Sequence, residues 1–398
     1  MRVFQLNTFC GVKSTGRIAC EIAKLVEADG GKCRIGYGVP GISADSERFA
    51  YRIGTPLERK LHAVSRKLLD AEGYGSYLGT QKLIEEIKNF QPDLIQLHNL
   101  HGCYLHLDSL FSFLAKLDVP VVWTLHDCWP FTGHCAYFDY SHCDRWKTHC
   151  KHCPQQKNYP ACIGLDGSVR NYNFKKECFT RLKNMTFVAP CEWMLRPFSE
   201  SYLRDYPTRV IYNGVNRDVF HPQNSDLRSK WGIGEKKLCL AVASEWDERK
   251  GLRFMIRLAS QMPNTCFAVL GLLPQMPEVI PPNLLLPGSI NSTEELVKWY
   301  STADCLINPT LEDNMPMVNL EALASGTPVI TFATGGCPEA VDESSGIVVP
   351  QSDFEALCAA VQSVDKPKMT EACLLRANKF DAQTTFRAYL DLYKELCL

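Results

Sequence analysis

The apolar positions of the chain fall into short runs that alternate with longer segments of helical period. In the first half the runs are RVFQLN, KCRIGYG, DLIQLHN, VPVVWTLHD and TFVAP, and residues 14–29 after the first run have helical spacing. The second half repeats the alternation with KLCLAVAS, TCFAVLG, LLLPGS, DCLINPT, TPVITFAT and SGIVVP. Such runs are typical of strands buried on both faces of a parallel sheet, and their alternation with helices indicates βαβ units. The pattern predicts an α/β fold with two Rossmann-like, doubly wound domains.

The junction between the two halves is expected near residue 215. The segment 210–222, VIYNGVNRDVFHP, ends a strand in an Asn-Gly turn and continues into polar sequence. A chain of 398 residues with 45% hydrophobic content is too long for one ordinary core and suits two domains of about 200 residues each. We therefore expect a first domain over residues 1–215 and a second over residues 216–380, facing each other across a cleft.

Composition and charge narrow the partners and the location. The formal net charge of −1 gives no electrostatic reason to expect nucleic acid. The chain begins with an apolar strand rather than a signal-peptide layout, and no apolar run approaches the roughly 20 residues that span a bilayer. Many of the 19 cysteines lie inside apolar strands, which favours free thiols in a reducing compartment. We expect a cytoplasmic protein.

Two carboxylates flank the start of one short predicted helix. Asp313 lies in the loop before this helix, Pro316 suits its first turn, and Glu321 lies inside it. A helix start offers unpaired backbone N–H groups and a positive dipole end, which suit a phosphate. The carboxylates would then accept hydrogens from sugar hydroxyls. This segment predicts a binding site for a sugar nucleotide.

Further loops at the predicted strand ends carry glycines and cations. In open parallel sheets ligands bind beyond the carboxyl ends of the strands, so these loops belong to the same functional edge. The first strand is followed by a glycine loop, which either approaches a diphosphate or is purely structural, and an Arg-Lys pair after KLCLAVAS is either a phosphate contact or a solvated face. The residues concerned are Gly11 and Gly16 in the first loop, Arg249 and Lys250 in the second, and Gly335 and Gly336 in a third.

Read in order, these segments resemble one enzyme family. The NGV turn, RKG, the acidic pair with seven residues between, GTPVI, GG.PE and SGIVVP are similar to the retaining glycosyltransferases of GT-B fold, of group 1 and family 4 type. That large group contains sucrose synthases and bacterial capsule, exopolysaccharide and lipopolysaccharide transferases. The resemblance covers nearly the whole chain, and it implies that the last segment, residues 381–398, is a helix crossing back to the first domain.

The resemblance also implies roles for single residues in the second domain. Asp313 and the amides of Asn314 and Met315 would hold the donor sugar, Glu321 would bind the ribose hydroxyls, and Lys250 would grip the diphosphate. The chain departs from the family pattern at two places. Asp313 stands where the family usually has Glu, and the usual phosphate-binding Arg falls near Ser244 or Glu245. Arg249 is the hypothetical substitute for that missing charge.

In the first domain the resemblance points to His126, directly after a buried strand, as an active-site histidine near the donor sugar. Asp127 would orient it or contact acceptor hydroxyls. His98 and Asn99 end the preceding strand at the same level and would line the acceptor side. The alternative for all of these is a structural role as hydrogen-bonding groups at strand ends.

The implied chemistry needs neither a protein nucleophile nor a catalytic metal. In the family's favoured route the acceptor hydroxyl attacks from the front face, the leaving phosphate takes its proton, and the configuration of the donor's anomeric carbon is retained. The protein would hold donor and acceptor in line and stabilise the leaving diphosphate with Lys250, Arg249 and helix-start amides. Fixed cations would replace magnesium, so no cofactor is expected for catalysis.

A cysteine-rich insert is expected at about residues 128–165 of the first domain. A loop this long with little periodicity needs something to hold it, and four thiolates on one structural zinc would do so. The best four are Cys135, Cys143, Cys150 and Cys153, of which the last two form a CxxC. The alternatives are free thiols packed with Trp129, Phe131 and Trp146, or a metal mix involving His149 and His152.

A basic amphipathic helix is predicted over residues 56–70, PLERKLHAVSRKLLD. Its apolar positions, Leu57, Leu61, Val64 and Leu68, recur at helical spacing among Arg and Lys. Such a helix either lies on an anionic membrane, where lipid-linked acceptors sit, or packs on its own domain.

The sequence therefore predicts a transferase that moves a sugar from a UDP- or GDP-type donor to a glycan or lipid-linked acceptor, in bacterial surface polysaccharide synthesis. Two rival functions stay open. One is a sugar-nucleotide 2-epimerase, which shares the architecture but needs no acceptor. The other is an inactive, zinc-stabilised sugar-binding module.

Overall fold

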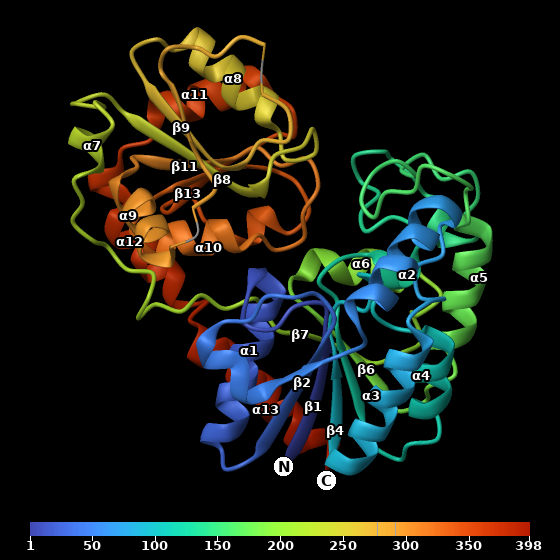
Figure 1. Ribbon diagram of the computed structural model, residues 1–398. Coiled ribbons are helices and arrows are strands. Elements are labelled where there is room, and N and C mark those ends of the chain that lie inside the picture. Colours follow the sequence, from blue (N-terminus) through green and yellow to red (C-terminus); the bar gives the residue numbers. More distant parts are fainter. Residues whose placement is uncertain (277, 291) are drawn as a thin grey trace. The chain divides into compact units, whose positions relative to one another are not determined.

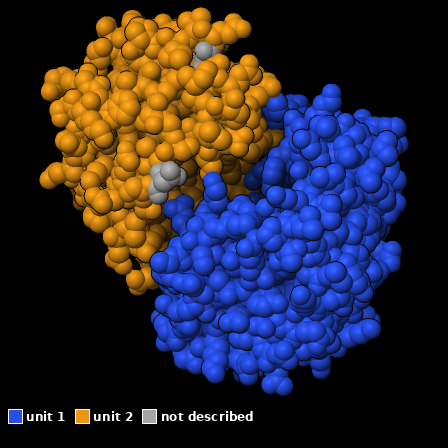
Figure 2. Space-filling view, viewed as in Figure 1, with its two compact units in different colours: residues 1–212, 386–398 blue, residues 213–385 orange. Residues whose placement is uncertain are grey.

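The computed structural model describes residues 1–276, 278–290 and 292–398. The chain divides into two compact units, each with its own sheet (Figures 1 and 2). Unit 1 comprises residues 1–212 and 386–398, and unit 2 comprises residues 213–385. The change of unit thus lies at residues 212–213, inside the Asn-Gly segment near which the sequence pattern puts the junction at 215.

Unit 1 contains a parallel sheet of seven strands in the order β3-β2-β1-β4-β5-β6-β7. Its apolar runs are buried on both faces, as parallel strands under helices require. The order reverses direction between β1 and β4, which is where such sheets bind ligands. The strands are β1 Arg2–Asn7, β2 Lys32–Tyr37, β3 Ala50–Arg52, β4 Leu94–Leu97, β5 Val121–Thr124, β6 Met185–Ala189 and β7 Thr208–Val210.

Helices cover both faces of this sheet (Figure 1). They are α1 Lys13–Ala28, α2 Pro56–Leu69, α3 Tyr77–Phe90, α4 Leu107–Leu114, α5 Ser168–Phe179 and α6 Leu195–Ser199, with short 3-10 turns η1 Ala44–Phe49, η2 Trp129–Phe131, η3 Arg145–Lys147 and η4 Glu192–Met194. Helix α2 begins at a capped turn, where the Thr55 side chain accepts the Glu58 N–H at 3.2 Å and Pro56 occupies the first helical position.

The last helix of the chain, α13 (Ala382–Leu396), starts in unit 2 and packs on the sheet of unit 1. Tyr393 donates its hydroxyl to Gln96 Oε1 at 2.9 Å, and Tyr389 shares a hydrogen bond of 3.0 Å with Thr124. Both tyrosines are buried. These polar contacts under the sheet fix the register of the helix against β4 and β5.

Unit 2 contains a parallel sheet of six strands in the order β10-β9-β8-β11-β12-β13, which changes direction between β8 and β11. The strands are β8 Leu238–Glu245, β9 Cys266–Leu272, β10 Leu284–Gly288, β11 Cys305–Asn308, β12 Val329–Phe332 and β13 Gly346–Val349. The helices are α7 Leu227–Lys230, α8 Leu252–Gln261, α9 Thr293–Thr302, α10 Met317–Ala324, α11 Phe354–Ser363 and α12 Lys366–Asn378, with a 3-10 turn η5 Cys337–Ala340. The two sheets confirm the predicted pair of Rossmann-like domains.

The cysteine-rich insert of unit 1 folds around an aromatic cluster rather than around strands. Phe138 and Trp146 stack with ring centroids 4.4 Å apart, and Phe131 packs against Trp146 at 5.5 Å. All cysteines of the described chain are free thiols. Among the described helices none is both long and apolar enough to cross a bilayer.

Candidate functional site

The acidic loop of unit 2, residues 309–316, joins the end of β11 to helix α10. Pro316 is the N-cap of α10, with φ −69° and ψ 124°, so the helix begins one residue later than the predicted first-turn position. The fixed φ of proline suits either place, but the extended ψ keeps Pro316 outside the helix. Gly326 ends the helix in the left-handed region at φ 74°, as its sequence position predicts.

Lys250 and Asp313 form the central ion pair of this edge. Lys250 Nζ lies 2.6 Å from Asp313 Oδ2, and their side chains are 24% and 12% exposed. The Asp247 carboxylate accepts the Lys250 backbone N–H at 2.8 Å. Two loops 63 residues apart in sequence therefore bring a cation and a carboxylate together at the point where the strand order reverses.

Glycines allow the loops of this edge to touch. Gly251 has φ 78°, and a Cβ placed on it would lie 2.1 Å from the Pro309 carbonyl oxygen. Gly335 has φ 55°, and a Cβ there would lie 1.7 Å from the Asp313 carbonyl oxygen. Both positions therefore exclude any residue with a side chain, and they hold the cation loop and the loop after β12 against the acidic loop.

Hydrogen bonds from three other segments fix the backbone of the acidic loop. Leu311 N–H donates to the Arg249 carbonyl at 2.7 Å, Thr334 donates its hydroxyl to the Thr310 carbonyl at 2.9 Å, and Gln351 donates to the Leu311 carbonyl at 3.1 Å. Gln351 follows the last strand, and no motif in the sequence marks it. The sequence does not predict its hydrogen bond to Leu311, because this contact depends on which strand ends are neighbours in the sheet.

The amides assigned to the donor sugar are engaged inside the loop. Asn314 N–H donates to Asp313 Oδ1 at 3.0 Å, and Met315 N–H donates to Asn314 Oδ1 at 2.5 Å. Asn213 donates to the Met315 carbonyl at 2.9 Å. The Asp313 carboxylate thus holds an amide with one oxygen and Lys250 with the other.

Arg249 lies beside this pair with its guanidinium turned toward the loop backbone. Its Nη1 donates to the Glu312 carbonyl at 3.4 Å, and its Nε lies 3.5 Å from Asp247 Oδ2. Its side chain is 26% exposed. The guanidinium is therefore at the same loop level as Lys250, while its role as a substitute phosphate ligand stays a prediction.

Glu321 is buried on α10, with 2% of its surface exposed. Tyr300, on α9, donates its hydroxyl to Glu321 Oε2 at 2.9 Å. This contact fixes the orientation of the carboxylate, and its oxygens have room to accept from further hydrogen-bond donors. Tyr300 is a residue that sequence reasoning missed, because a tyrosine on an amphipathic helix usually serves the core.

In unit 1 a histidine pair lies at the carboxyl ends of two neighbouring strands. His98 and His126 follow the neighbouring strands β4 and β5, and His98 Nδ1 lies 2.9 Å from His126 Nε2. His98 Nε2 lies 2.8 Å from Gln5 Oε1. The rings are stacked at 5.2 Å. The two predicted residues do lie together.

The hydrogen-bond network assigns the tautomers of this pair. Gln5 donates its amide to the Ala19 carbonyl at 2.9 Å, so its oxygen accepts from His98 Nε2. Neutral His98 then accepts from His126 Nε2–H, which leaves the lone pair of neutral His126 on Nδ1. Burial lowers the pKa of His126 to about 4, with Asp127 opposing and His101 adding to the effect. Burial, together with His126, also holds the pKa of His98 well below its ordinary value.

Asp127 is paired with His101. Its Oδ2 lies 2.8 Å from His101 Nε2, and its Oδ1 accepts the Trp129 N–H at 2.9 Å. Burial alone would raise the pKa of Asp127, but His101 and the Trp129 amide outweigh it and the pKa lies below its ordinary value. Tyr159 from the insert shares a bond of 3.1 Å with His101 Nδ1. His101 was missed, although it stands in the same LHNLHG run as His98.

The remaining predicted residues of unit 1 have visible structural roles. Gly11 has φ 68°, and a Cβ there would lie 2.2 Å from Ser43 Oγ; its N–H donates to the Gly16 carbonyl at 3.0 Å. Gly16 lies in the first turn of α1. Asn99 accepts the Tyr104 hydroxyl at its backbone carbonyl at 2.6 Å. These contacts shape the loops after β1 and β4, and ligand contacts by the three residues stay predictions.

We expect His126 to make stability fall in mild acid. Its pKa is about 4 in the folded protein and about 6.5 in the unfolded chain, so between these values the unfolded state binds more protons and protonation favours unfolding. The unfolding free energy of the wild type should drop about 2 kcal/mol more than that of His126→Gln between about pH 7 and about pH 5. Chemical denaturation at both pH values measures this difference in unfolding free energy.

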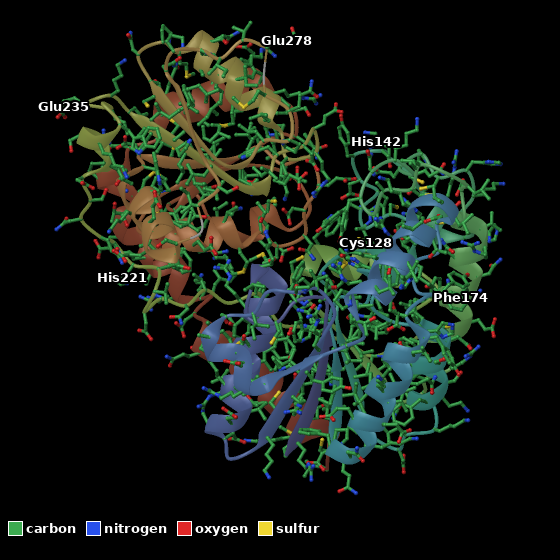
Figure 3. The ribbon with its side chains drawn as sticks, viewed as in Figure 1. Cys128, His142, Phe174, His221, Glu235 and Glu278 are labelled. Atoms are coloured by element: carbon green, nitrogen blue, oxygen red, sulfur yellow. The ribbon has the colours of Figure 1, made fainter. Side chains whose placement is uncertain are left out.

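The exposed His221 (Figure 3) supplies the control, since His221→Gln should follow the wild type. Parallel curves for wild type and His126→Gln would contradict the buried neutral imidazole.

The comparisons with known proteins agree with this geometry. Residues 236–365 match the family model described as glycosyl transferases group 1, and residues 42–219 match the model described as glycosyltransferase family 4. WcaC of Escherichia coli (strain K12), assigned to colanic acid biosynthesis as a glycosyl transferase, is 27% identical over 293 residues, 71% of this chain and 69% of that protein. A D-inositol 3-phosphate glycosyltransferase of Saccharomonospora viridis is 38% identical over 108 residues, 26% of this chain and 25% of that protein.

Solved structures show the same fold over the whole chain. Sucrose-phosphate synthase from Thermosynechococcus elongatus superimposes with a TM-score of 0.72 at 17% identity, covering 99% of this chain and 98% of that one. HepE of Anabaena, solved in complex with UDP-glucose, has a TM-score of 0.67 at 15% identity and full coverage of both chains. With two family models that together match most of the chain, at residues 42–219 and 236–365, the protein belongs to the group 1 and family 4 glycosyltransferases of GT-B fold.

Proposed function

We propose that this transferase moves a sugar with retention from a UDP- or GDP-type nucleotide sugar to a glycan or lipid-linked acceptor, in the synthesis of a bacterial surface polysaccharide. The observation that carries the proposal is the Lys250–Asp313 pair at the switch point of the second sheet, on the same segment as the buried Glu321. Support for the donor class comes from the related Anabaena fold, which was solved with UDP-glucose. Support for the pathway comes from the similarity to WcaC.

The ion pair offers a cation that an anionic donor would bind. At 2.6 Å Lys250 is neutralised by Asp313, and a diphosphate with more charge than one carboxylate would compete for the ammonium group. Release of Lys250 would free Asp313 Oδ2 to accept a sugar hydroxyl. Asp313 is one methylene shorter than the family's usual acid, and it reaches Lys250 at 2.6 Å.

Transition-state stabilisation would come from fixed charge and position. Lys250, with Arg249 beside it, would offset the charge that develops on the leaving diphosphate. His126 would act as a neutral imidazole that hydrogen-bonds a donor hydroxyl, since its pKa of about 4 keeps it uncharged near neutrality. A general-acid role for His126 near neutral pH does not fit that pKa.

On the acceptor side, helix α2 presents an apolar stripe to solvent. Leu57, Leu61, Val64 and Leu68 are 66%, 63%, 54% and 48% exposed, while His62 is the buried residue of the helix. The helix thus contacts its own domain through His62, while these four apolar side chains stay exposed. Ile163 and Leu165 of the insert, 63% and 68% exposed, donate their backbone N–H groups to the Lys67 and Leu68 carbonyls at 2.9 Å. The exposed apolar surface continues from α2 onto the insert.

We infer that this surface, residues 57–69 with 163–165, contacts an anionic membrane that carries a lipid-linked acceptor. The exposed Lys60 and Lys67 flank the apolar stripe and complement anionic headgroups. An amphipathic helix with a wet apolar face and adjacent lysines buries that face in the headgroup layer. Exposed apolar side chains that form one continuous surface mark interaction sites on proteins.

The membrane contact predicts a specific loss of vesicle binding. Leu61→Asp should lower the fraction of protein that sediments with phosphatidylglycerol-containing vesicles by about tenfold, because a charge replaces a buried leucine in the headgroup layer. Leu375→Asp is the matched control, since Leu375 is 67% exposed on α12 of unit 2 and should leave sedimentation unchanged. Equal sedimentation of wild type and Leu61→Asp would contradict the membrane contact. Equal sedimentation of the wild type with anionic and with neutral vesicles would contradict it as well.

One assay tests the function and separates its rivals. The protein is mixed with a panel of nucleotide sugars, and free nucleotide is measured with and without lipid-linked and oligosaccharide acceptors. A transferase releases nucleotide slowly from one donor and faster with acceptor, whereas an epimerase converts the sugar without release and a binding module does neither. In EDTA the rate should persist or be restored by zinc alone; restoration that requires magnesium would contradict catalysis by fixed cations.

A further inference from the structure

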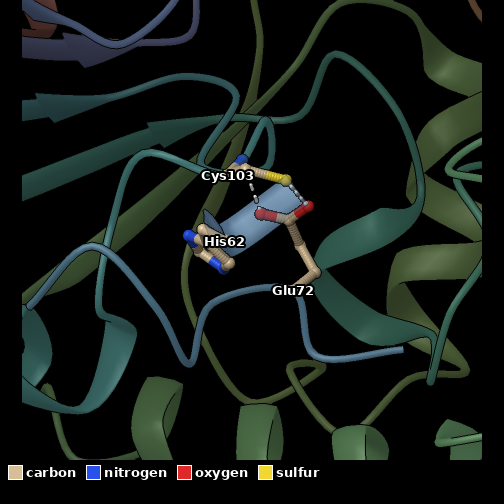
Figure 4. Close-up of side chains that lie close together, drawn as sticks. All are labelled: His62, Glu72 and Cys103. Carbon is tan, nitrogen blue, oxygen red and sulfur yellow. Dashed lines mark hydrogen bonds between the residues drawn. The ribbon is translucent and has the colours of Figure 1, made fainter. Parts of the chain in front are cut away.

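Two sets of metal-ligating side chains lie in unit 1, and the second contains a buried nitrogen without a hydrogen-bond partner among the described residues. The first cluster, His62, Glu72 and Cys103, brings its ligand atoms within 4.8 Å of one another (Figure 4). His62 Nε2 lies 3.1 Å from the Ala71 carbonyl oxygen and 3.2 and 3.3 Å from the backbone nitrogens of Gly73 and Gly75, and Nδ1 lies 3.0 Å from Ser76 Oγ. Glu72 accepts the Cys103 N–H at 2.9 Å. These atoms are used by the protein itself and tie the segment after α2 to the loop after β4.

The second cluster surrounds a small cavity of about 10 Å³ in the cysteine-rich insert. Its lining includes the four cysteines that the sequence selects, Cys135, Cys143, Cys150 and Cys153, and in addition His134. Cys135 and Cys150 are buried, whereas Cys143 and Cys153 are partly exposed. The insert thus gathers four thiols and one imidazole around a space too small for a substrate.

His134 carries the strongest sign of an absent ligand. Its side chain is 0% exposed, and its Nδ1 lies 2.6 Å from Asp70 Oδ1. Its Nε2 is buried and has no hydrogen-bond partner among the described residues. A buried polar atom without a partner is destabilising, so the fold carries an uncompensated cost at this nitrogen. A carboxylate that accepts Nδ1–H and leaves Nε2 for a metal is the usual second partner of a ligating histidine.

The thiols are held in place by the backbone. Gly133 donates its N–H to Cys150 Sγ at 3.1 Å, and a Cβ on Gly133 would lie 2.6 Å from Cys150 Cβ. Cys135 and Cys153 hydrogen-bond each other through their thiols. Asp70, which braces His134, also accepts the Gly167 N–H at 3.1 Å. N–H groups that point at sulfur and a braced histidine are outer contacts typical of zinc sites.

We propose that the insert binds one structural zinc ion through His134 Nε2, Cys135, Cys150 and Cys153, with their side chains closing on the ion as it binds. This set differs from the four-cysteine set of the sequence prediction. With four cysteines as ligands the buried His134 Nε2 would stay without a partner. Cys143 and Cys153 are both partly exposed, but Cys153 is in hydrogen-bond contact with the buried Cys135, so Cys143 is the thiol that solvent can satisfy. His134 and Cys135 are consecutive in the sequence and line the same cavity, so both side chains are placed beside the proposed ion.

The ion would add a further link between three segments that hydrogen bonds already bring together. Asp70 caps the end of α2, residues 134–153 lie in the insert, and the insert leads to α5 through Gly167. A zinc ion here therefore stabilises the surface formed by α2 and the insert. The proposal is independent of the transferase reaction, since its readouts are metal content and spectra.

The test compares two matched variants of the full chain. Wild type purified without chelator should contain about one zinc per chain, and its cobalt derivative should show the d–d spectrum of a tetrahedral site with three sulfurs and one nitrogen. His134→Gln should lose at least about tenfold in cobalt affinity, and Cys143→Ser should bind like wild type. Loss of cobalt by Cys143→Ser with retention by His134→Gln would overturn the ligand set in favour of four cysteines. Wild type with well under one metal per chain, which takes up no cobalt, would overturn the site itself; this arm needs no variant to fold.

Discussion

We expect Lys250→Ala to lower kcat for sugar transfer by about 10²- to 10³-fold, the range observed when one group that stabilises developing negative charge is removed. Lys250 lies where the strand order of the second sheet reverses, and its ammonium group lies 2.6 Å from the Asp313 carboxylate. A bound diphosphate would compete with this carboxylate for the ammonium group, and Lys250 would then stabilise the leaving group. Lys250→Arg keeps the charge and should recover part of the rate. Steady-state kinetics on the donor identified by the nucleotide panel measures both.

The control for this variant is Lys298→Ala. Lys298 Nζ also lies 2.6 Å from a carboxylate, that of Glu294, but the pair is exposed on α9 and serves no loop of the functional edge. Its removal should leave kcat within about twofold, because exposed pairs contribute little. A Lys250→Ala enzyme as fast as Lys298→Ala would show that the leaving group is stabilised by other residues.

Gly335→Ala should be nearly as damaging, although Gly335 carries no functional group. The added Cβ would lie 1.7 Å from the Asp313 carbonyl oxygen, so the acidic loop must move to admit it. A displacement of about 1 Å in a positioning element costs about 10²-fold in rate, and we expect kcat to fall by that order. The left-handed φ of 55° adds a stability cost of about 1 kcal/mol.

Gly234→Ala separates the two effects. Gly234 has φ 59° and nothing within 4 Å of the added Cβ, so this variant carries the conformational cost without the clash. Both variants should lose a similar amount of thermal stability through φ, and only Gly335→Ala should lose activity. If Gly335→Ala kept full activity with the stability of Gly234→Ala, the contact between the two loops would have no role in catalysis.

The sequence predicts the architecture because buried parallel strands leave an unambiguous pattern. Runs such as DLIQLHN and DCLINPT became β4 and β11, with the polar residues His98 and Asn308 at their ends. The short edge strand β3, Ala50–Arg52, has partly exposed residues and gave no such signal. Strand-end loops could therefore be named, and the motif spacing placed Asp313 and Glu321 around α10.

Pairings across loops could not be predicted, since they depend on which strands become neighbours. The partners Lys250 and Asp313 are 63 residues apart, and Gln351 reaches the acidic loop only because β13 lies beside β12. Likewise, helical spacing predicts α2 but does not predict that its apolar face is exposed to solvent. His134 was invisible for the same reason: its brace, Asp70, lies 64 residues away.

The central claim is that the edge formed by Lys250, Asp313 and Glu321 is the seat of the nucleotide-sugar donor. The most direct test is a crystal structure of the full chain with UDP or GDP, whichever binds more tightly by calorimetry. The account predicts the diphosphate within about 3 Å of Lys250 Nζ and the ribose hydroxyls on the Glu321 carboxylate. A nucleotide bound elsewhere, with Lys250 still on Asp313 and Glu321 contacting no ribose, would contradict it.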